Sequence, residues 1–392
     1  MTKIVSRNIW VDYLRSALTV LVVAHHSSLA YTTFASFDKI AYIRSTHAIV
    51  DDKRWVGLDI FENFNDVFFM SLMFLIGGLF LSSSIKKKGA WTFVRERFFR
   101  LFLPFILGGT FLMLIAYFPS YYVAKGSADI GKYVNDFFNV EMWPVGPPWF
   151  IWVLFLFNVL FALLYLIFPK IAGNTSRFFS WFQTRPWLFV GFIFLITWVL
   201  YVPMSFAIGT DQWTGFGPFD FQVNRILLYF GYFLLGTWIG SAGFNENLFS
   251  LTSEIINKWA LWVTLALVTY IVLTLIPPSL TQMVKDDKLS EVVGYTIYFS
   301  IYTASCTFSG IAFITAFRKL AQTPMSWWDS LAANAYLIYL VHYVFVTWTQ
   351  FLLLDYDLPA FLKFLITFIV ALVLSWIVSS VLRKVSWINK YL

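Results

Sequence analysis

The sequence predicts an all-α integral membrane protein, built as a bundle of about ten transmembrane helices. Hydrophobic residues make up 59% of the 392 residues and charged residues only 12%, whereas soluble globular proteins carry about 25% charged residues. The chain also contains 18 Trp, 20 Tyr and 45 Phe, which suits a lipid-facing surface with interfacial belts. This composition, with a single cysteine, excludes the disordered, coiled-coil and disulfide-rich secreted classes.

Charged residues, Pro and Gly divide the chain into ten apolar runs, each near the roughly 20 residues that cross a bilayer. The predicted helices are 12–34, 64–84, 101–123, 148–169, 187–205, 224–243, 258–276, 291–317, 330–354 and 358–382. The first, eighth and ninth runs are diluted by polar residues, so we expect these helices to face the bundle interior. The first is expected to be a retained helix rather than a cleaved signal. Residues 1–392 are therefore expected to form a single transmembrane domain with no additional soluble domain.

The distribution of charge predicts the orientation of the bundle. With ten helices and the N-terminus inside, most Lys and Arg fall on inner segments and most acids on outer segments, as in the positive-inside rule. Both termini are therefore predicted to be cytoplasmic. The net charge of +7 is then a topological signal, and no nucleic-acid partner is expected. We expect a multi-pass protein of the cell membrane, surrounded by the lipid bilayer.

Asp12, Arg15 and His26 form a polar stripe on the first predicted helix. Eleven residues at about 100° each bring His26 to within about 20° of Arg15, whereas His25 points about 100° away. At about 1.5 Å per residue, His26 lies about 22 Å from Val11, well inside the membrane. An ionisable side chain at such depth indicates a functional site. The alternative is structural, with His26 in an interhelical hydrogen bond and Arg15 extended to the cytoplasmic surface.

Five segments of the chain resemble the acyltransferase-3 family of integral membrane O-acyltransferases. The first is residues 12–26, in which ten residues separate Arg15 from His26, as in the family's first helix. The others are similar to later family patterns and occur in the expected order: 68–78, with Gly77 where Ser is usual; Arg97-Phe-Phe-Arg100; 146–150, which includes Trp149; and 335–342, which ends in Tyr339-Leu-Val-His342. The five segments are spread along nearly the whole chain.

The resemblance implies a transmembrane acyltransferase domain that transfers an acyl group, usually acetyl from cytoplasmic acetyl-CoA. The acceptor would be a hydroxyl of a cell-surface carbohydrate or a lipid-linked molecule at the outer face. Because no added outer domain is expected, either this chain completes the transfer or a separate extracytoplasmic partner protein does.

The residues of the first helix fit this chemistry. A neutral imidazole is suited to removing a hydroxyl proton, so His26 is the expected general base, or alternatively an acyl-carrying nucleophile. Arg15 would stabilise the developing oxyanion or guide the donor, with Asp12 holding it from one turn away. No metal is expected, because no pair of His or carboxylate residues has HExxH-like spacing.

The cationic segment before the third predicted helix is the expected donor site. Arg97 and Arg100 would bind the phosphates of acetyl-CoA, with Arg95 in the same segment, because the guanidinium fork suits bidentate phosphate pairing. The alternative is that these are ordinary basic residues of a loop that faces anionic lipid.

Four residues are expected to contact the acceptor: Tyr339 and His342, which share a helix face, Asp66 at the start of an otherwise apolar helix, and Trp149. The alternative for Tyr339 and His342 is that they join helices by hydrogen bonds. His47, in an outer loop, is expected to be solvated.

The competing class is a transporter or flippase, in which Arg15 and His26 would contact substrate or relay protons. A third class, a membrane sensor or scaffold, has no positive support in the sequence.

Overall fold

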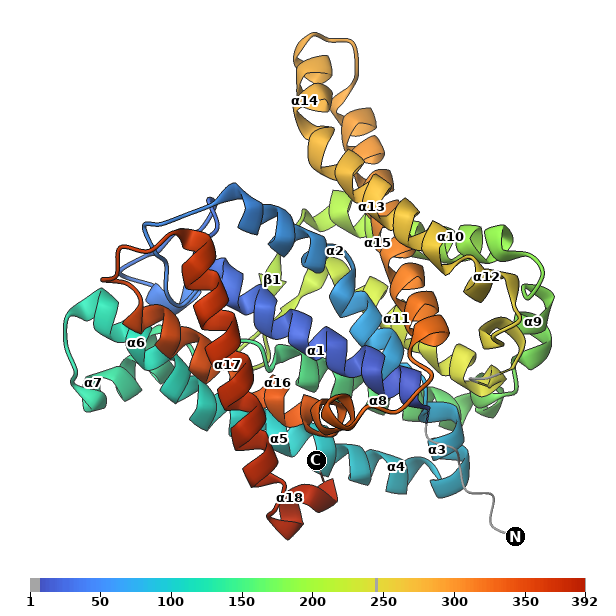
Figure 1. Ribbon diagram of the computed structural model, residues 1–392, viewed down its shortest axis with the longest axis horizontal. Coiled ribbons are helices and arrows are strands. Elements are labelled where there is room, and N and C mark those ends of the chain that lie inside the picture. Colours follow the sequence, from blue (N-terminus) through green and yellow to red (C-terminus); the bar gives the residue numbers. More distant parts are fainter. Residues whose placement is uncertain (1–7, 244–245, 392) are drawn as a thin grey trace.

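The computed structural model describes residues 8–243 and 246–391, and helices make up nearly all of its regular structure (Figure 1). The two-residue strands β1 (Trp213–Thr214) and β2 (Phe221–Gln222) pair antiparallel and are the only sheet in these residues. Eight helical segments in the described part are long and apolar enough to cross a membrane, or nine if the bent pair Val223–Ala242 and Asn247–Asn257 is one span. The predicted fold class, an all-α integral membrane protein, is confirmed.

Each of the ten predicted runs contains a helix. The long helices are α1 (Ile9–Leu29), α2 (Val56–Gly78), α4, α5 and α6 (Ala90–Arg97, Leu103–Leu107 and Met113–Lys125), α8 (Trp149–Ile167), α10 (Pro186–Ile208), α11 (Ile226–Ala242), α13 (Trp259–Leu275), α15 (Glu291–Leu320), α16 (Ser326–Leu352) and α17 (Ala360–Leu382). The shorter helices are α3 (Leu81–Lys88), α7 (Ile130–Asn135), α9 (Ser176–Trp181), α12 (Glu254–Asn257), α14 (Pro277–Lys285) and α18 (Ser386–Tyr391). The number of ten spans stays a prediction, because α1, rich in His, Ser and Thr, is not among the apolar candidates.

Helix α2 begins at Val56 rather than near residue 64, because its acidic residues have partners that allow them to lie within a helix. Asp59 Oδ1 accepts a hydrogen bond from the Thr33 backbone N–H at 2.7 Å. Glu62 Oε1 lies 3.7 Å from His25 Nε2 of α1. These acids therefore do not mark the end of the helix, as their charge alone suggests.

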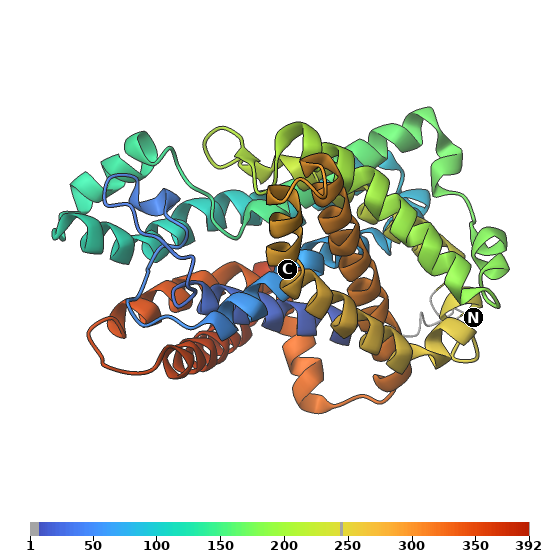
Figure 2. The same cartoon turned by 90° about the horizontal axis from the view of Figure 1, so that it is seen from above.

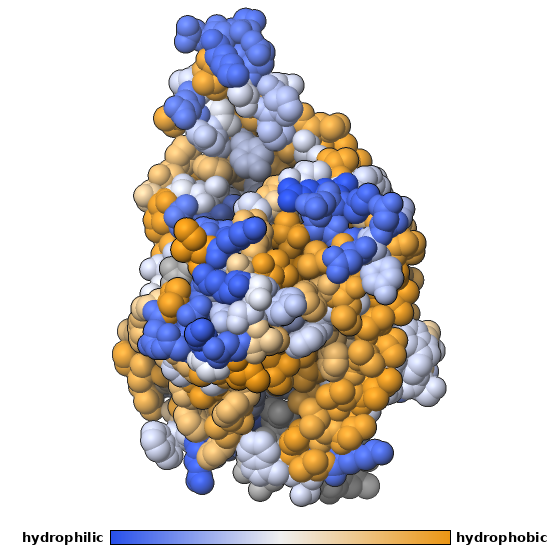
Figure 3. All heavy atoms as spheres, turned by 90° about the vertical axis from the view of Figure 1, so that its left-hand side faces the viewer, coloured by the Kyte–Doolittle hydropathy of each residue, from blue (hydrophilic) through white to orange (hydrophobic). Residues whose placement is uncertain are grey.

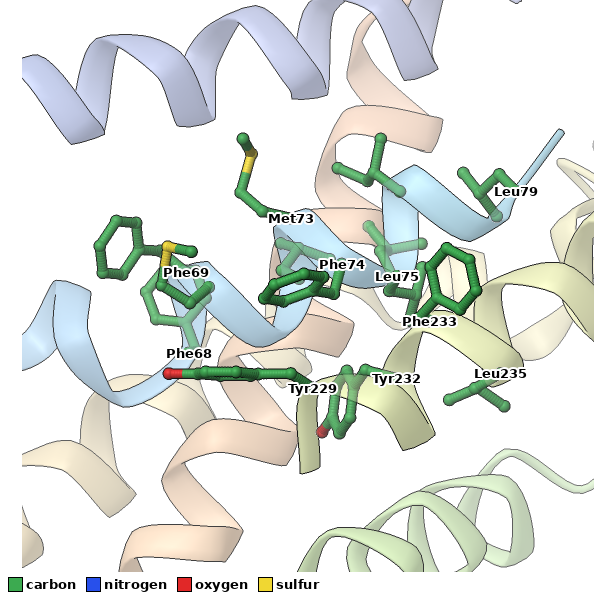
Figure 4. Packing of buried hydrophobic residues seen from close by; sticks show 14 of the residues in the cluster. Phe68, Phe69, Met73, Phe74, Leu75, Leu79, Tyr229, Tyr232, Phe233 and Leu235 are labelled. Atoms are coloured by element: carbon green, nitrogen blue, oxygen red, sulfur yellow. The ribbon is translucent and has the colours of Figure 1, made fainter. Parts of the chain in front are cut away.

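Helices α2 and α11 pack at unusually short range (Figure 4). A Cβ placed on Gly236 would lie 1.9 Å from the Leu75 carbonyl oxygen, and one on Gly240 would lie 1.7 Å from the Leu79 carbonyl oxygen. Small residues spaced by four, as here, let two backbones approach closely in a membrane. The aromatic side chains beside this contact fill the core of the bundle (Figure 4).

Helix α1 begins, and helix α17 ends, at the same end of the bundle, where Arg15 and Arg383 line one cavity. We call this the terminal end. The opposite end carries the segment 30–55, which lies against α6, and the projecting α14 (Figures 1 and 2). On the left-hand side of Figure 1 the surface is hydrophobic over wide areas, with hydrophilic patches at the projecting tip and across the middle (Figure 3). Residues 1–7 and 392 lie outside the described residues, so the cytoplasmic location of both termini stays a prediction.

Candidate active site

A cavity of about 520 Å³ lies at the terminal end, between α1, α2, α8, α16, the end of α17 and the continuous helix Ala90–Lys125, which comprises α4 to α6. We call it the arginine cavity, because four guanidinium groups line it. Its lining includes Arg15, Thr19, Gly77, Phe80, Arg97, Arg100, Phe150, Leu154, Asn158, Tyr336, Tyr339, Arg383 and Asn389. No Asp or Glu is among its described lining residues. The cavity is therefore strongly cationic on an otherwise apolar and aromatic wall.

The helix Ala90–Lys125 places Arg97 and Arg100 on the cavity. Arg97 ends α4 and stands over the Phe93 ring at 5.2 Å, while Arg100 lies in a π-helical segment, η2 (Phe98–Phe102). Such π-helical turns are frequent at functional sites. The Tyr336 hydroxyl of α16 donates a hydrogen bond to the Arg100 carbonyl at 2.9 Å, which fixes this turn against α16.

The structure brings together three of the four arginines that sequence analysis selected. Arg15 is half exposed and its Nη2 lies 3.4 Å from Asp12 Oδ1, the i,i+3 pairing expected on α1. Arg15, Arg97 and Arg100 all line the arginine cavity, whereas Arg95 is exposed on α4 and lies outside its lining. The fourth guanidinium is that of Arg383.

His26 and His342 meet beyond the inner end of the arginine cavity. His26 Nδ1 lies 2.9 Å from the Val22 carbonyl oxygen and 3.4 Å from His342 Nε2. His342 Nδ1 lies 2.7 Å from the carbonyl oxygen of Tyr339, the last α16 residue to line the cavity. The histidine pair is thus one helical turn from the cavity wall.

The backbone carbonyls set the tautomers of both histidines. A carbonyl oxygen only accepts hydrogen bonds, so Nδ1 carries the proton in neutral His26 and in neutral His342. His342 Nε2 is then an acceptor, which can share the His26 Nδ1–H. His26 Nε2 keeps its lone pair, so the ring can act as a base or nucleophile at that atom.

The neighbouring His25 points to a different part of the bundle, as the helical phase predicts. Its Nε2 lies 3.7 Å from Glu62 Oε1, and its ring centroid is 5.1 Å from that of Phe69. Both partners belong to α2. Only one of the two adjacent imidazoles therefore joins His342.

The prediction that His47 is solvated is wrong, because the segment 30–55 folds back over α16. The His47 side chain is buried, and its Nε2–H donates a hydrogen bond to Gln350 Oε1 at 2.8 Å. The Gln350 amide in turn donates to the His26 carbonyl at 3.2 Å. Burial lowers the pKa of His47 to about 3, so the ring is neutral at pH 7. His47 and Gln350 thus form a chain of hydrogen bonds to the backbone of His26, from the end of the bundle opposite the terminal end.

A buried ion pair holds the segment 30–55 in this position. Lys363 Nζ of α17 lies 2.6 Å from Asp51 Oδ2, and both side chains are almost fully buried. A buried charge needs such a partner, because an isolated ion is strongly disfavoured away from water.

Asp66 and Trp149 lie at a second polar cluster, around the start of α11. Arg225 Nη2 pairs with Asp66 Oδ2 at 2.7 Å and with Asp211 Oδ1 at 3.2 Å. The Trp149 ring stands edge-on to the Trp213 ring, with centroids 5.3 Å apart. The predicted acceptor residues are therefore divided: His342 lies against His26, Tyr339 lines the arginine cavity, and the other two lie in this cluster. The Tyr339 hydroxyl donates to the Pro147 carbonyl, so it also joins α16 to the start of α8.

Sequence analysis missed Arg383, Asn158 and Gln350. Arg383 follows the last apolar run, where a basic residue is explained by topology alone. The polar residues inside the helices carry no local motif. The signal that could have drawn attention to them is the cost of a polar side chain in an apolar helix.

These features define a multi-pass membrane protein with a cationic cavity at one end and a histidine pair inside the bundle. The family model described as "Acyltransferase domain" matches residues 8–380, and the chain belongs to this family, acyltransferase-3. The protein is therefore a membrane acyltransferase. Comparisons with curated proteins and with solved structures found no match. In the described part of the chain, no three His, Cys, Asp or Glu side chains group in a way that could hold a metal ion.

Proposed function

We propose that this protein is an O-acyltransferase that moves an acyl group, most simply acetyl, from acyl-CoA to a hydroxyl of a cell-surface carbohydrate or lipid-linked acceptor. The observation that carries this proposal is the arrangement of four arginines around one cavity, whose inner end lies one turn from the His26–His342 pair. The terminal end would face the cytoplasm of a cell membrane, where acyl-CoA is available.

The arginine cavity suits the donor because acyl-CoA has several phosphate charges at one end. Planar guanidinium groups bind phosphate oxygens through paired, charge-assisted hydrogen bonds. Arg97, Arg100 and Arg383 have no ion pair with an acid among the described residues, so their charge is available to a ligand. The ligand must be elongated, because the eleven residues from Arg15 to His26 rise by about 16 Å along α1.

The proposed reaction uses His26 as a general base. The acceptor hydroxyl gives its proton to His26 Nε2 while its oxygen attacks the thioester carbonyl carbon. The C–S bond then breaks, and the leaving sulfur takes the proton from His26. During this step the imidazolium Nδ1–H remains bound to the Val22 carbonyl and to His342 Nε2, which stabilises the transient positive charge. The same geometry also allows Nε2 to carry the acyl group as a covalent intermediate.

The acceptor would approach from the opposite end of the bundle. The Asp66–Arg225 pair and the Trp149 and Trp213 rings offer charged, hydrogen-bonding and aromatic contacts. A hydroxyl-rich acceptor matches this mixture of groups. A separate extracytoplasmic protein would present or receive such an acceptor when it is a polymer.

Transfer or hydrolysis of labelled acetyl-CoA by the full chain in lipid vesicles tests the proposal. We expect activity in the wild type, its loss in His26→Ala and substantial activity in His25→Ala. His25 is the matched control because it immediately precedes His26 on the same helix and faces Glu62. Both variants must stay monodisperse in lipid. Near wild-type transfer by His26→Ala, or a wild type that leaves acetyl-CoA intact, would contradict the proposal and favour a transporter or flippase.

A further inference from the structure

Asn158 is a polar residue on a largely apolar face of α8 that lines the arginine cavity, together with Phe150 and Leu154. It is 1% exposed. Its Nδ2 donates a hydrogen bond to the Leu154 carbonyl at 2.7 Å. Because that carbonyl can only accept, the orientation of the amide is fixed and Oδ1 is the atom left to face a different partner.

The Asn158 Oδ1 atom has no hydrogen-bond donor among the described residues. Buried polar atoms in folded proteins nearly always have a hydrogen-bond partner. A buried acceptor without a donor on a cavity wall therefore points to a ligand. The hydroxyls of three other residues that line the cavity already donate hydrogen bonds to backbone carbonyls. Thr19 donates to the Arg15 carbonyl, Tyr336 to that of Arg100 and Tyr339 to that of Pro147.

The ring contacts of α8 give the level of Asn158 in the cavity. Phe155 lies 6.2 Å from Phe98 and 5.1 Å from Phe102, measured between ring centroids. Asn158 follows Phe155 by nearly one turn toward the terminal end, which places it near the level of Arg97. This acceptor and the arginines that would hold the phosphates of the donor therefore line the same cavity.

We propose that Asn158 Oδ1 accepts a hydrogen bond from an N–H group of the acyl-CoA donor and so recognises an uncharged part of that ligand. This inference rests on the proposed function. A phosphate has no N–H group to donate, so the arginines and Asn158 would bind different parts of one molecule. Acyl-CoA carries N–H groups in two places: the exocyclic amine of its adenine and the amides of its pantetheine arm.

The test compares two isosteric variants of the full chain in lipid vesicles, Asn158→Thr and Asn158→Val. A threonine hydroxyl can donate to the carbonyl four residues back and still accept a hydrogen bond, whereas valine has the same shape and no polar atom. With acetyl-CoA we expect kcat/KM to fall by about five- to tenfold in Asn158→Val, the usual effect of one hydrogen bond, and to be largely kept in Asn158→Thr. Equal activity of both variants, whether high or low, would overturn the inference.

Two donor analogues identify the N–H group. If the adenine amine is recognised, the difference between the variants disappears with a deaminated, hypoxanthine form of acetyl-CoA. If a pantetheine amide is recognised, the difference persists with that analogue and with acetyl-pantetheine. Failure of the proposed function gives a different result, because the wild type would then use none of these donors.

Discussion

Arg383 contributes charge to the arginine cavity from the end of α17, far in sequence from Arg97 and Arg100. We expect Arg383→Gln to weaken acetyl-CoA binding by about 1–3 kcal/mol, the scale of a hydrogen bond to a charged group, with Arg97→Gln and Arg100→Gln behaving similarly. Calorimetry of acetyl-CoA binding to the full chain in lipid nanodiscs measures this change in binding free energy. Lys384→Gln is the matched control, because Lys384 is exposed and lies outside the cavity lining. Equal losses at 383 and 384 would indicate a general charge effect instead of a site.

His47 makes stability depend on pH in a defined window. Burial lowers its pKa from 6.5 to about 3, so the folded protein holds the ring neutral while the unfolded chain binds a proton below pH 6.5. The associated stability is fully present above pH 6.5 and is lost as the pH falls from there toward 3, by about 1.4 kcal/mol per pH unit. We expect His47→Gln, which can still donate to Gln350 but does not titrate, to show a smaller fall in thermal midpoint between pH 7 and pH 4.5. Parallel curves for the two proteins would show that His47 is accessible to protons in the folded state.

The contact between α2 and α11 depends on glycine at two positions of α11, Gly236 and Gly240, where a Cβ would meet the backbone of the partner segment. At Gly240 a Cβ would lie 1.7 Å from the Leu79 carbonyl oxygen, so the backbones must separate in Gly240→Ala. We expect a loss of about 1–3 kcal/mol, the usual cost of overpacking, seen as a lower thermal midpoint in detergent. Gly191→Ala in α10 is the control, since nothing lies within 4 Å of a Cβ there and alanine favours a helix. A Gly240→Ala variant as stable as Gly191→Ala would show that the two helices are not in close contact.

At the scale of elements, the apolar runs alone predict where the helices lie, because a bilayer requires a continuous apolar length. The start of α2 is the instructive exception. Asp59 and Glu62 suggest a loop when taken singly, but Thr33 and His25 lie close to them within the bundle. Such partners come from other segments of the chain, so no local sequence pattern predicts them.

For the whole molecule, the predicted orientation places Lys384 inside the cell and Lys288, just after α14, outside. Each can be replaced by cysteine in turn, because the single native Cys306 is fully buried and gives no background. We expect an impermeant thiol reagent to label Lys288→Cys on intact cells and to label Lys384→Cys only after lysis. Labelling of Lys384→Cys but not of Lys288→Cys on intact cells would show that the orientation is the reverse of the predicted one and that the donor site is not cytoplasmic. Labelling of both positions on intact cells would mean that an even number of spans, and not the predicted three, lies between them.

The sequence by itself determined the membrane class, the presence of a helix in each apolar run and the stripe that carries Arg15 and His26. Each follows from local physics: apolar length must match a bilayer, and a fixed rotation per residue sets which side chains share a face. The same rule correctly separated His26 from His25.

Only the tertiary structure decided which distant residues complete the site. It placed Arg383 on the same cavity as Arg97 and His342 against His26. It also showed that His47, an expected surface residue, is buried and linked through Gln350 to the His26 backbone. These contacts join residues that lie hundreds of positions apart. They depend on how helices pack and on where charged groups find partners away from water, and neither is encoded in any short stretch of the chain.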